Sequence, residues 1–162
     1  MLRYIFLDVD GTLTDGGIYI DSSGHEIKRF CVQDGAGILM ARERGIDCVI
    51  ITGRKSMCVE QRAKELNLKN VYQGVNDKKE KLRGFMAENR LSKDEVGYIG
   101  DDLNDLSAME LAGFVACPSN AARQVKNVSN YVAKSQGGYG AVREIIEYIL
   151  EALPHSSLID HS

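Results

Sequence analysis

An apolar run near the start of the chain ends in two carboxylates and a glycine, in the sequence YIFLDVDGTLT (residues 4–14). Its β-branched and aromatic residues are typical of a buried strand. Because side chains alternate along a strand, Asp8 and Asp10 are expected on the same side of its carboxyl end, where open α/β sheets bind ligands. Two carboxylates held this close repel each other unless a cation lies beside them, and hard oxygen ligands favour Mg²⁺. A simple Asp-Gly turn would not need the whole motif, so the run predicts a functional site.

The rest of the chain alternates between strand-like and helix-like segments. Strands are predicted at 47–52, 71–73, 96–100, 114–116 and 131–132, and helices at 36–44, 56–66, 78–89, 103–112, 121–126 and 141–153. This alternation predicts an α/β fold, a three-layer α/β/α Rossmann-like parallel sheet with helices on both faces. We expect one domain at residues 1–153, followed by a mobile tail at 154–162.

Residues 17–30 interrupt this alternation. Two extended stretches, 18–20 and 26–30, flank a glycine-containing turn and predict a β-hairpin. An isolated hairpin is marginally stable in water. We therefore expect the hairpin to protrude from the domain and to be covered by another part of the assembly.

Two later segments carry groups suited to phosphate. The strand at 47–52 ends in TGR (residues 52–54) just before a helix, where the Thr52 hydroxyl and free backbone N–H groups can hold a phosphoryl oxygen. An ordinary strand-to-helix turn explains these residues equally well. Lys78 begins a later helix, but lysines also follow at positions 79 and 81, and helix-surface lysines are usually only solvated. The residues alone leave both assignments open.

The segment GDDLND (residues 100–105) follows another apolar strand and contains Asp101, Asp102 and Asp105. Three acids at the carboxyl end of a strand repel one another unless a cation or a helix N-terminus compensates their charge. Helix capping needs only one of them. The segment therefore predicts a second group of metal ligands.

These four motifs, in this order and each after a predicted strand, resemble those of the haloacid dehalogenase superfamily of phosphatases. The resemblance implies that Asp8 attacks phosphorus to form an aspartyl-phosphate and that Asp10 is the general acid/base. It also implies that Thr52 donates a hydrogen bond to the phosphate and that Lys78 neutralises the transferring group.

The same resemblance implies a Mg²⁺ site. Asp8, the backbone carbonyl of Asp10 and Asp101 would be ligands, and Asp102 would hold a metal-bound water. Asp105 would support the ligands from outside the coordination sphere.

The intervals between the motifs hold only a hairpin, two helices and a short strand, so no cap domain is expected. A small substrate would then be exposed to water, where electrostatic stabilisation is weak. Either a macromolecular substrate covers the site itself, or a neighbouring subunit does. The hairpin is the expected contact between subunits.

The residues around the hairpin and the segment GGYGAVRE (residues 137–144) narrow the resemblance from the superfamily to one subfamily. They resemble the capless subfamily that hydrolyses 3-deoxy-D-manno-octulosonate 8-phosphate (KDO 8-phosphate) in lipopolysaccharide biosynthesis. That resemblance implies a homotetramer in which the hairpins form a central barrel and neighbours complete each site.

Four residues are candidate substrate contacts: Thr12, Arg29, Gly53 and Arg54. Arg54 suits a sugar-acid carboxylate through bidentate hydrogen bonding, and Arg29 could equally supply that cation. Thr12 departs from the subfamily, which often has Val there, although the wider superfamily commonly uses Thr.

Three other functions are considered. A phosphatase for nine-carbon sialic-type acid 9-phosphates would keep the chemistry. A non-catalytic tetramerisation module is disfavoured because Asp8, Asp10 and Asp101 are retained. A monomeric phosphoprotein phosphatase would leave the hairpin exposed.

Composition excludes further classes. A net charge of −3 without a basic stripe argues against nucleic acid, and no apolar run is long enough to cross a bilayer or to act as a leader. The four cysteines show no metal or redox spacing, so free thiols and a reducing, cytoplasmic location are expected.

Overall fold

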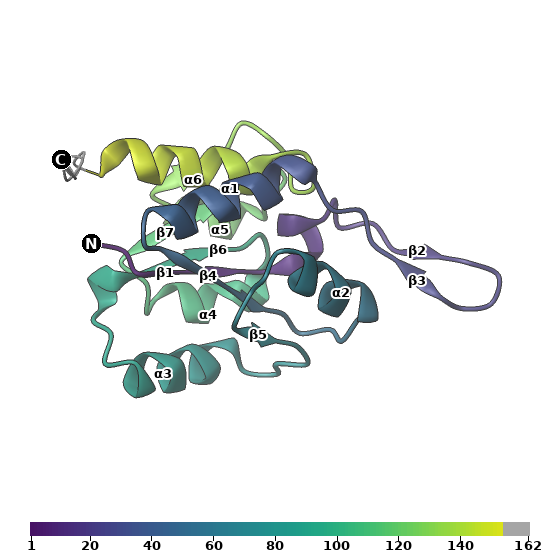
Figure 1. The fold of residues 1–162 in the computed structure, drawn as a ribbon, viewed down its shortest axis with the longest axis horizontal. Helices are drawn as coiled ribbons and strands as arrows, with labels where there is room; N and C mark the ends of the chain where they lie inside the picture. The colour runs from purple at the N-terminus through teal and green to yellow at the C-terminus, as the bar shows by residue number, and fades with distance from the viewer. Residues whose placement is uncertain (154–162) are drawn as a thin grey trace, which may run out of the picture.

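The computed structural model describes residues 1–153 and is built around a six-stranded, all-parallel sheet (Figure 1). The strands are ordered β5-β4-β1-β6-β7-β8. Their bounds are β1 Tyr4–Leu7, β4 Asp47–Ile51, β5 Val71–Tyr72, β6 Val96–Ile99, β7 Phe114–Cys117 and β8 Tyr131–Val132. The predicted α/β class is confirmed, and β1 lies inside the sheet between β4 and β6.

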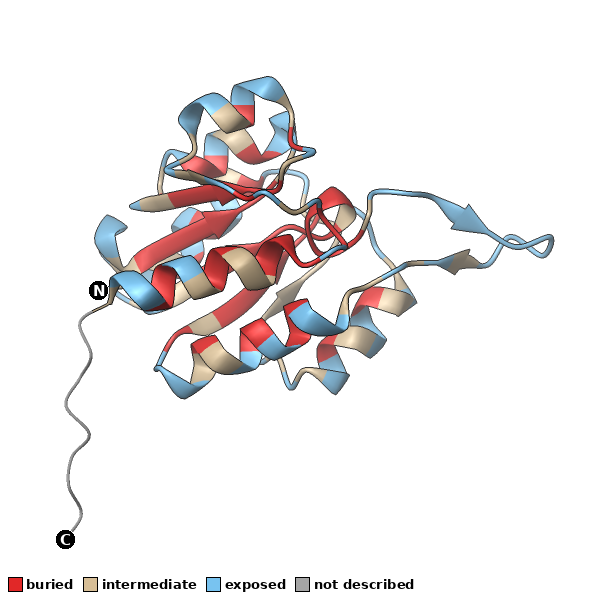
Figure 2. Ribbon diagram, turned by 90° about the horizontal axis from the view of Figure 1, so that it is seen from above, coloured by how far each residue is buried: buried red, intermediate tan, exposed pale blue. Residues whose placement is uncertain are grey.

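Helices cover both faces of this sheet. The helices are α1 Val32–Glu43, α2 Met57–Glu65, α3 Lys78–Glu88, α4 Leu106–Met109, α5 Arg123–Val128 and α6 Ala141–Ala152. Ile5 and Leu7 of β1 pack in one apolar cluster with α1, α2 and α6, whereas Phe6 packs in the other with α3, α4 and α5. This alternation within one strand produces the three layers, with buried strands between helices that are exposed on their outer sides (Figure 2).

The hairpin protrudes from the domain, as predicted (Figure 1). Its strands β2 (Tyr19–Ile20) and β3 (Glu26–Ile27) pair antiparallel, and one bridge joins Thr14 to Phe30 nearer the domain. The paired part is shorter than the predicted stretches at 18–20 and 26–30. Three isoleucines on it are exposed to solvent, Ile18 and Ile20 at 63% and Ile27 at 57%. Between β1 and α1 the chain forms this hairpin and no cap domain.

Helix α1 begins four residues before the predicted start at residue 36. Gly35 lies just before the predicted start and Gly37 lies just inside it, and at both positions another helix approaches closely. A Cβ at Gly37 would lie 3.1 Å from the Cα of Arg143 in α6, and one at Gly35 would lie 2.7 Å from the Arg62 guanidinium. The glycines therefore permit close helix packing and do not mark a helix boundary.

The helix predicted at 103–112 was wrong in form. A 3₁₀ turn (Leu103–Asp105) leads into the short helix α4. The Asp105 carboxylate accepts hydrogen bonds from the backbone N–H groups of Asp101 and Asp102, at 3.1 and 3.2 Å. These bonds hold the backbone of residues 101–105 in a tight turn, so a regular α-helix starts only after Asp105.

Within residues 1–153, no helix combines the length and the apolar character that a membrane crossing needs. The predicted tail at 154–162 lies outside the described residues.

Candidate active site

Three neighbouring strands bring the predicted motifs to one edge of the sheet. Asp8 follows β1, Thr52 follows β4 and Asp101 comes two residues after the end of β6. Because β4, β1 and β6 are adjacent and parallel, their carboxyl ends lie side by side. Asp8 and Thr52 are buried and Asp101 is partly buried. Strand order therefore assembles residues that are far apart in the sequence.

Lys78, at the start of α3, reaches into this group. Its Nζ donates to Asp8 Oδ1 and to Asp105 Oδ1, each at 2.8 Å, and its side chain is buried. Burial disfavours the charged lysine, but the two carboxylates outweigh this effect and raise the pKa of Lys78 above its ordinary value. An ammonium has three N–H donors, so the two carboxylates leave one for a third acceptor.

Asp105 is saturated with hydrogen bonds. Its Oδ1 accepts from Lys78 and, at 2.7 Å, from the hydroxyl of Tyr98, while its Oδ2 accepts the two backbone bonds described above. Tyr98 lies in β6 and is fully buried. The sequence reading missed Tyr98 because a tyrosine inside an apolar strand has no signal that distinguishes it from core.

Asp8, Asp101 and Asp105 each offer a carboxylate oxygen, and these oxygens lie within 4.8 Å of one another. Burial raises the pKa of Asp101, and burial together with the Asp105 charge raises the pKa of Asp8 well above its ordinary value despite Lys78. A cation at this point would relieve the repulsion. Since Asp105 is already saturated, Asp8 and Asp101 are the carboxylates suited to hold it.

The loop after β1 is shaped to accommodate Asp101. Gly11 adopts a φ of +87°, and a Cβ there would lie 2.1 Å from Asp101 Oδ2. Thr12 is buried, and its hydroxyl donates to Asp101 Oδ1 at 3.1 Å. The hydroxyl therefore orients a carboxylate of the cluster. The substrate contact at Thr12 stays a prediction.

Asp102 lies outside the cluster. Its exposed side chain accepts from the N–H of Leu103 at 2.8 Å, so it caps the turn that follows. In this structure it contributes a cap. The contact with a metal-bound water, which the family resemblance implies, stays a prediction.

Asp10 is joined to the hairpin by a chain of ion pairs. Lys28 Nζ lies 2.6 Å from Asp10 Oδ1 and 2.8 Å from Glu26 Oε1. Glu26 Oε2 in turn lies 3.2 Å from the predicted substrate residue Arg54, which follows the exposed Gly53. The sequence reading missed Lys28 and Glu26, since charged residues in an extended stretch read as an exposed strand face.

The glycine-rich segment before α6 braces the loop after β1. A Cβ at Gly137 would lie 1.9 Å from the carbonyl oxygen of Gly11, and Gly138 adopts a φ of +76° against Asp15. Asn120 links the same backbones, donating to Gly11 O at 3.2 Å and accepting from Gly137 N at 2.7 Å. These glycines allow two loops to approach more closely than any side chain would permit.

Arg29 lies at the base of the hairpin and not beside the carboxylates. Its guanidinium donates to Gly138 O and stacks on the Tyr139 ring, with the guanidinium carbon 4.1 Å from the ring centroid. Within one chain it therefore fastens the hairpin to the glycine-rich loop.

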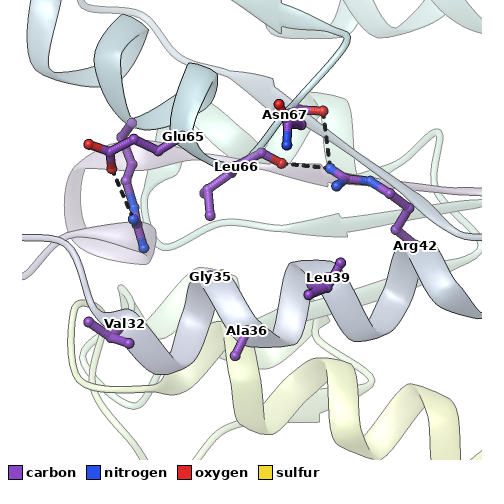
Figure 3. Close-up of a pocket in the computed structure, with 9 residues that line it drawn as sticks. Val32, Gly35, Ala36, Leu39, Arg42, Glu65, Leu66 and Asn67 are labelled. Atoms are coloured by element: carbon purple, nitrogen blue, oxygen red, sulfur yellow. Dashed lines mark hydrogen bonds and ion pairs between the residues drawn. The ribbon is translucent and has the colours of Figure 1, made fainter.

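A separate hollow of about 340 Å³ lies between α1 and α2 (Figure 3). Apolar side chains of Leu39 and Leu66 line it, and Arg42 at its end donates to the carbonyls of Leu66 and Asn67. None of the predicted catalytic residues lines it, so it is distinct from the carboxylate cluster.

The chain matches known proteins at the level of sequence and fold. Residues 70–146 match the haloacid dehalogenase-like hydrolases. The chain is 38% identical over 151 residues to 3-deoxy-D-manno-octulosonate 8-phosphate phosphatase KdsC of Escherichia coli K12, covering 93% of this chain and 80% of that protein.

Two solved structures extend this similarity. The 3-deoxy-D-manno-octulosonate 8-phosphate phosphatase of Moraxella catarrhalis, in complex with magnesium ion, phosphate ion and KDO, matches with a TM-score of 0.89, 43% identity and coverage of 93% and 86% of the two chains. The cobalt-bound Haemophilus influenzae enzyme matches with a TM-score of 0.89, 34% identity and coverage of 98% and 93%.

A parallel sheet with Asp8, Thr52 and Asp101 at its carboxyl edge is the architecture of a haloacid dehalogenase-like hydrolase, in agreement with the match over residues 70–146. The chain belongs, within that class, to the family of 3-deoxy-D-manno-octulosonate 8-phosphate phosphatases.

Proposed function

We propose that this protein is a Mg²⁺-dependent phosphomonoesterase that hydrolyses KDO 8-phosphate to KDO and phosphate, in lipopolysaccharide biosynthesis. The observation that carries the proposal is the buried group at the ends of β1 and β6, in which Lys78 is fixed between Asp8 and Asp105. The activity of relatives that match most of the chain supports the choice of substrate.

In the first step, a carboxylate oxygen of Asp8 attacks phosphorus and the bond to the sugar oxygen breaks. Asp10 gives its proton to that oxygen, which leaves as the alcohol. Since Lys28 engages Oδ1 of Asp10, we assign the proton transfer to Oδ2.

In the second step, water attacks the aspartyl-phosphate and returns a proton to Asp10. The oxygen–phosphorus bond of Asp8 breaks, and inorganic phosphate is released. The third N–H of Lys78 and the hydroxyl of Thr52 stabilise the phosphoryl oxygens in both steps.

Asp8, Asp101 and the backbone carbonyl of Asp10 would hold Mg²⁺. Two observations support the fit of this site to Mg²⁺. The carboxylates lie close together, and Gly11 leaves space for the Asp101 side chain. Bound Mg²⁺ supplies charge neutralisation at the phosphoryl oxygens. On the substrate side, we assign the sugar-acid carboxylate to Arg54 and contacts to the phosphate to the backbone at Gly53.

The test compares phosphate release from KDO 8-phosphate and from a nine-carbon sialic-type acid 9-phosphate, with wild type and Asp8→Asn. We expect a strong preference for the eight-carbon compound and loss of turnover in the variant. Asp94→Asn, which changes an exposed carboxylate, is the matched control and should retain activity. Preference for the nine-carbon compound would refute the substrate, and turnover by Asp8→Asn would refute the nucleophile.

We propose further that the protein is a homotetramer in which the hairpins pack together and neighbours complete each site. Exposed isoleucines on a protruding hairpin support this assignment. Light scattering should give four chains for wild type and fewer for Ile20→Lys, whereas a monomeric wild type would contradict the proposal.

A cytoplasmic location is also proposed, because Cys31, Cys48, Cys58 and Cys117 are all free thiols. Cell fractionation tests it, and recovery of the protein outside the cytoplasm would contradict it.

A further inference from the structure

The chain of ion pairs beside Asp10 has an unusual arrangement. Lys28 and Arg54 bind different oxygens of the same Glu26 carboxylate, at 2.8 and 3.2 Å. When each oxygen of one carboxylate contacts a different cation, the arrangement is suited to binding a carboxylate ligand. The cations come from separate elements, the hairpin and the loop after β4, and both contact Glu26.

The position of this arrangement is equally informative. Lys28 also contacts Oδ1 of Asp10, the group to which we assign protonation of the leaving oxygen. The remainder of the substrate must lie on this side, beyond the bond that breaks. An anionic group on the substrate, some atoms away from the phosphate, would meet Lys28 and Arg54 there.

The exposure of the three side chains favours an exchangeable contact. The side chain of Lys28 is 2% exposed, while those of Glu26 and Arg54 are 23% and 49% exposed. Lys28 is thus held inside, and Glu26 is the accessible member that lies between the two cations. The Glu26–Arg54 pair is partly exposed, and such pairs contribute little to stability, so a ligand can displace it at small cost.

We propose that Lys28 is a specificity-determining residue that binds the substrate carboxylate together with Arg54, at the position that the Glu26 carboxylate occupies in this structure. The inference rests on the proposed function, because it needs a substrate with a carboxylate as well as a phosphate. Glu26 is then an internal counter-ion that the substrate displaces. Its role is to hold the two cations together before substrate binds.

The experiment compares Lys28→Met and Glu26→Gln with wild type on two substrates, KDO 8-phosphate and p-nitrophenyl phosphate, which lacks a carboxylate. Lys28→Met should raise KM for KDO 8-phosphate about tenfold and leave KM for p-nitrophenyl phosphate unchanged, because a charged hydrogen bond to only one substrate is lost. Glu26→Gln should lower KM for KDO 8-phosphate only, because the competing carboxylate is removed. Lys79→Met, which removes a cation paired with Glu110 on another surface, should change neither KM.

Other outcomes would overturn the inference. Equal loss of kcat on both substrates with an unchanged KM for KDO 8-phosphate would mean that Lys28 serves Asp10 alone. A fall in thermal stability without a KM change would make it an anchor for the hairpin. If Lys28→Met does not fold, a Glu26→Gln variant with unchanged or raised KM for KDO 8-phosphate would still reject the proposal. Failure of the proposed function is distinguishable, since wild type would then show no preference for KDO 8-phosphate.

Discussion

Asp34 provides a test of the structure that is independent of catalysis. It lies in α1, is 1% exposed, and accepts a hydrogen bond at Oδ1 from the backbone N–H of Arg143 at 3.0 Å, while Oδ2 has no partner among the described residues. Burial raises the pKa of Asp34 to about 6 from an ordinary value of 3.8. The N–H groups at the start of α6, with Arg62 of α2 and Arg143 of α6, oppose this rise without cancelling it.

The sign of the effect follows from linkage. The folded protein binds the Asp34 proton more tightly than the unfolded chain, so the protonated carboxyl stabilises the fold below pH 3.8. That stabilisation is lost as the pH rises through about 6. A shift of about 2 units corresponds to about 3 kcal/mol between these limits.

Asp34→Asn keeps the shape and removes the titration. Urea unfolding of wild type and variant at pH 4.5 and pH 7.5 should show the variant gaining stability relative to wild type at the higher pH, with a double difference of about 2 kcal/mol. Asp94→Asn corrects for the loss of one negative charge. A double difference near zero would refute the reasoning, because it would mean that the helix N-terminus and the two arginines compensate the burial of Asp34.

Four further predictions concern the site. Lys78→Met should lower kcat by about 10²–10³-fold with an intact fold by circular dichroism, since the transferring group loses its cation. Tyr98→Phe should lower kcat about tenfold without changing KM, because Asp105 loses one of the bonds that orient Lys78, whereas Tyr4→Phe in the same apolar layer should leave kcat unchanged. Mg²⁺ at a hundred times its Kd should stabilise wild type by about 2.7 kcal/mol in thermal unfolding, and Asp101→Ala should abolish this gain. Gly137→Ala should destabilise the protein by about 3 kcal/mol in urea, because its Cβ would overlap Gly11 O, while Gly84→Ala, with open space around it, should not.

The sequence predicted the parts of the site that depend on strand ends. Asp8, Thr52 and Asp101 each follow a recognisable apolar strand, and a parallel sheet must gather such positions at one edge. The same reasoning could not find Tyr98. Only the hydrogen bond from its hydroxyl to Asp105 distinguishes it from an ordinary core residue, and the sequence gives no sign of that bond. The hydrophobic pattern of a strand predicts which face of the sheet a residue occupies, but it does not predict which buried polar atom the residue contacts.

The hairpin marks a second limit of sequence reasoning. The two extended stretches around a glycine-containing turn predicted the hairpin. The contact of Lys28 with Asp10, in contrast, depends on the angle at which the hairpin leaves the domain. That angle is set by the close approach of Gly137 and Gly138 to the loop after β1, and by Arg29 at the base of the hairpin, which donates to the carbonyl of Gly138. Backbone approach of this kind has no signal in composition or periodicity, although the run of glycines at 137–140 marks where it occurs.

The two groups of charges at this edge of the sheet differ in balance, and the difference explains their separate functions. The outer network pairs Asp10 and Glu26 with Lys28 and Arg54, so its charges cancel without a ligand. The buried group sets three carboxylates, Asp8, Asp101 and Asp105, against the single ammonium of Lys78 and retains an excess of two negative charges. Buried charge that remains uncompensated raises carboxyl pKa values, as it does at Asp8 and Asp101, or attracts a cation of matching charge. A divalent ion therefore belongs in the inner group, whereas the outer network can exchange one carboxylate for another at little electrostatic cost.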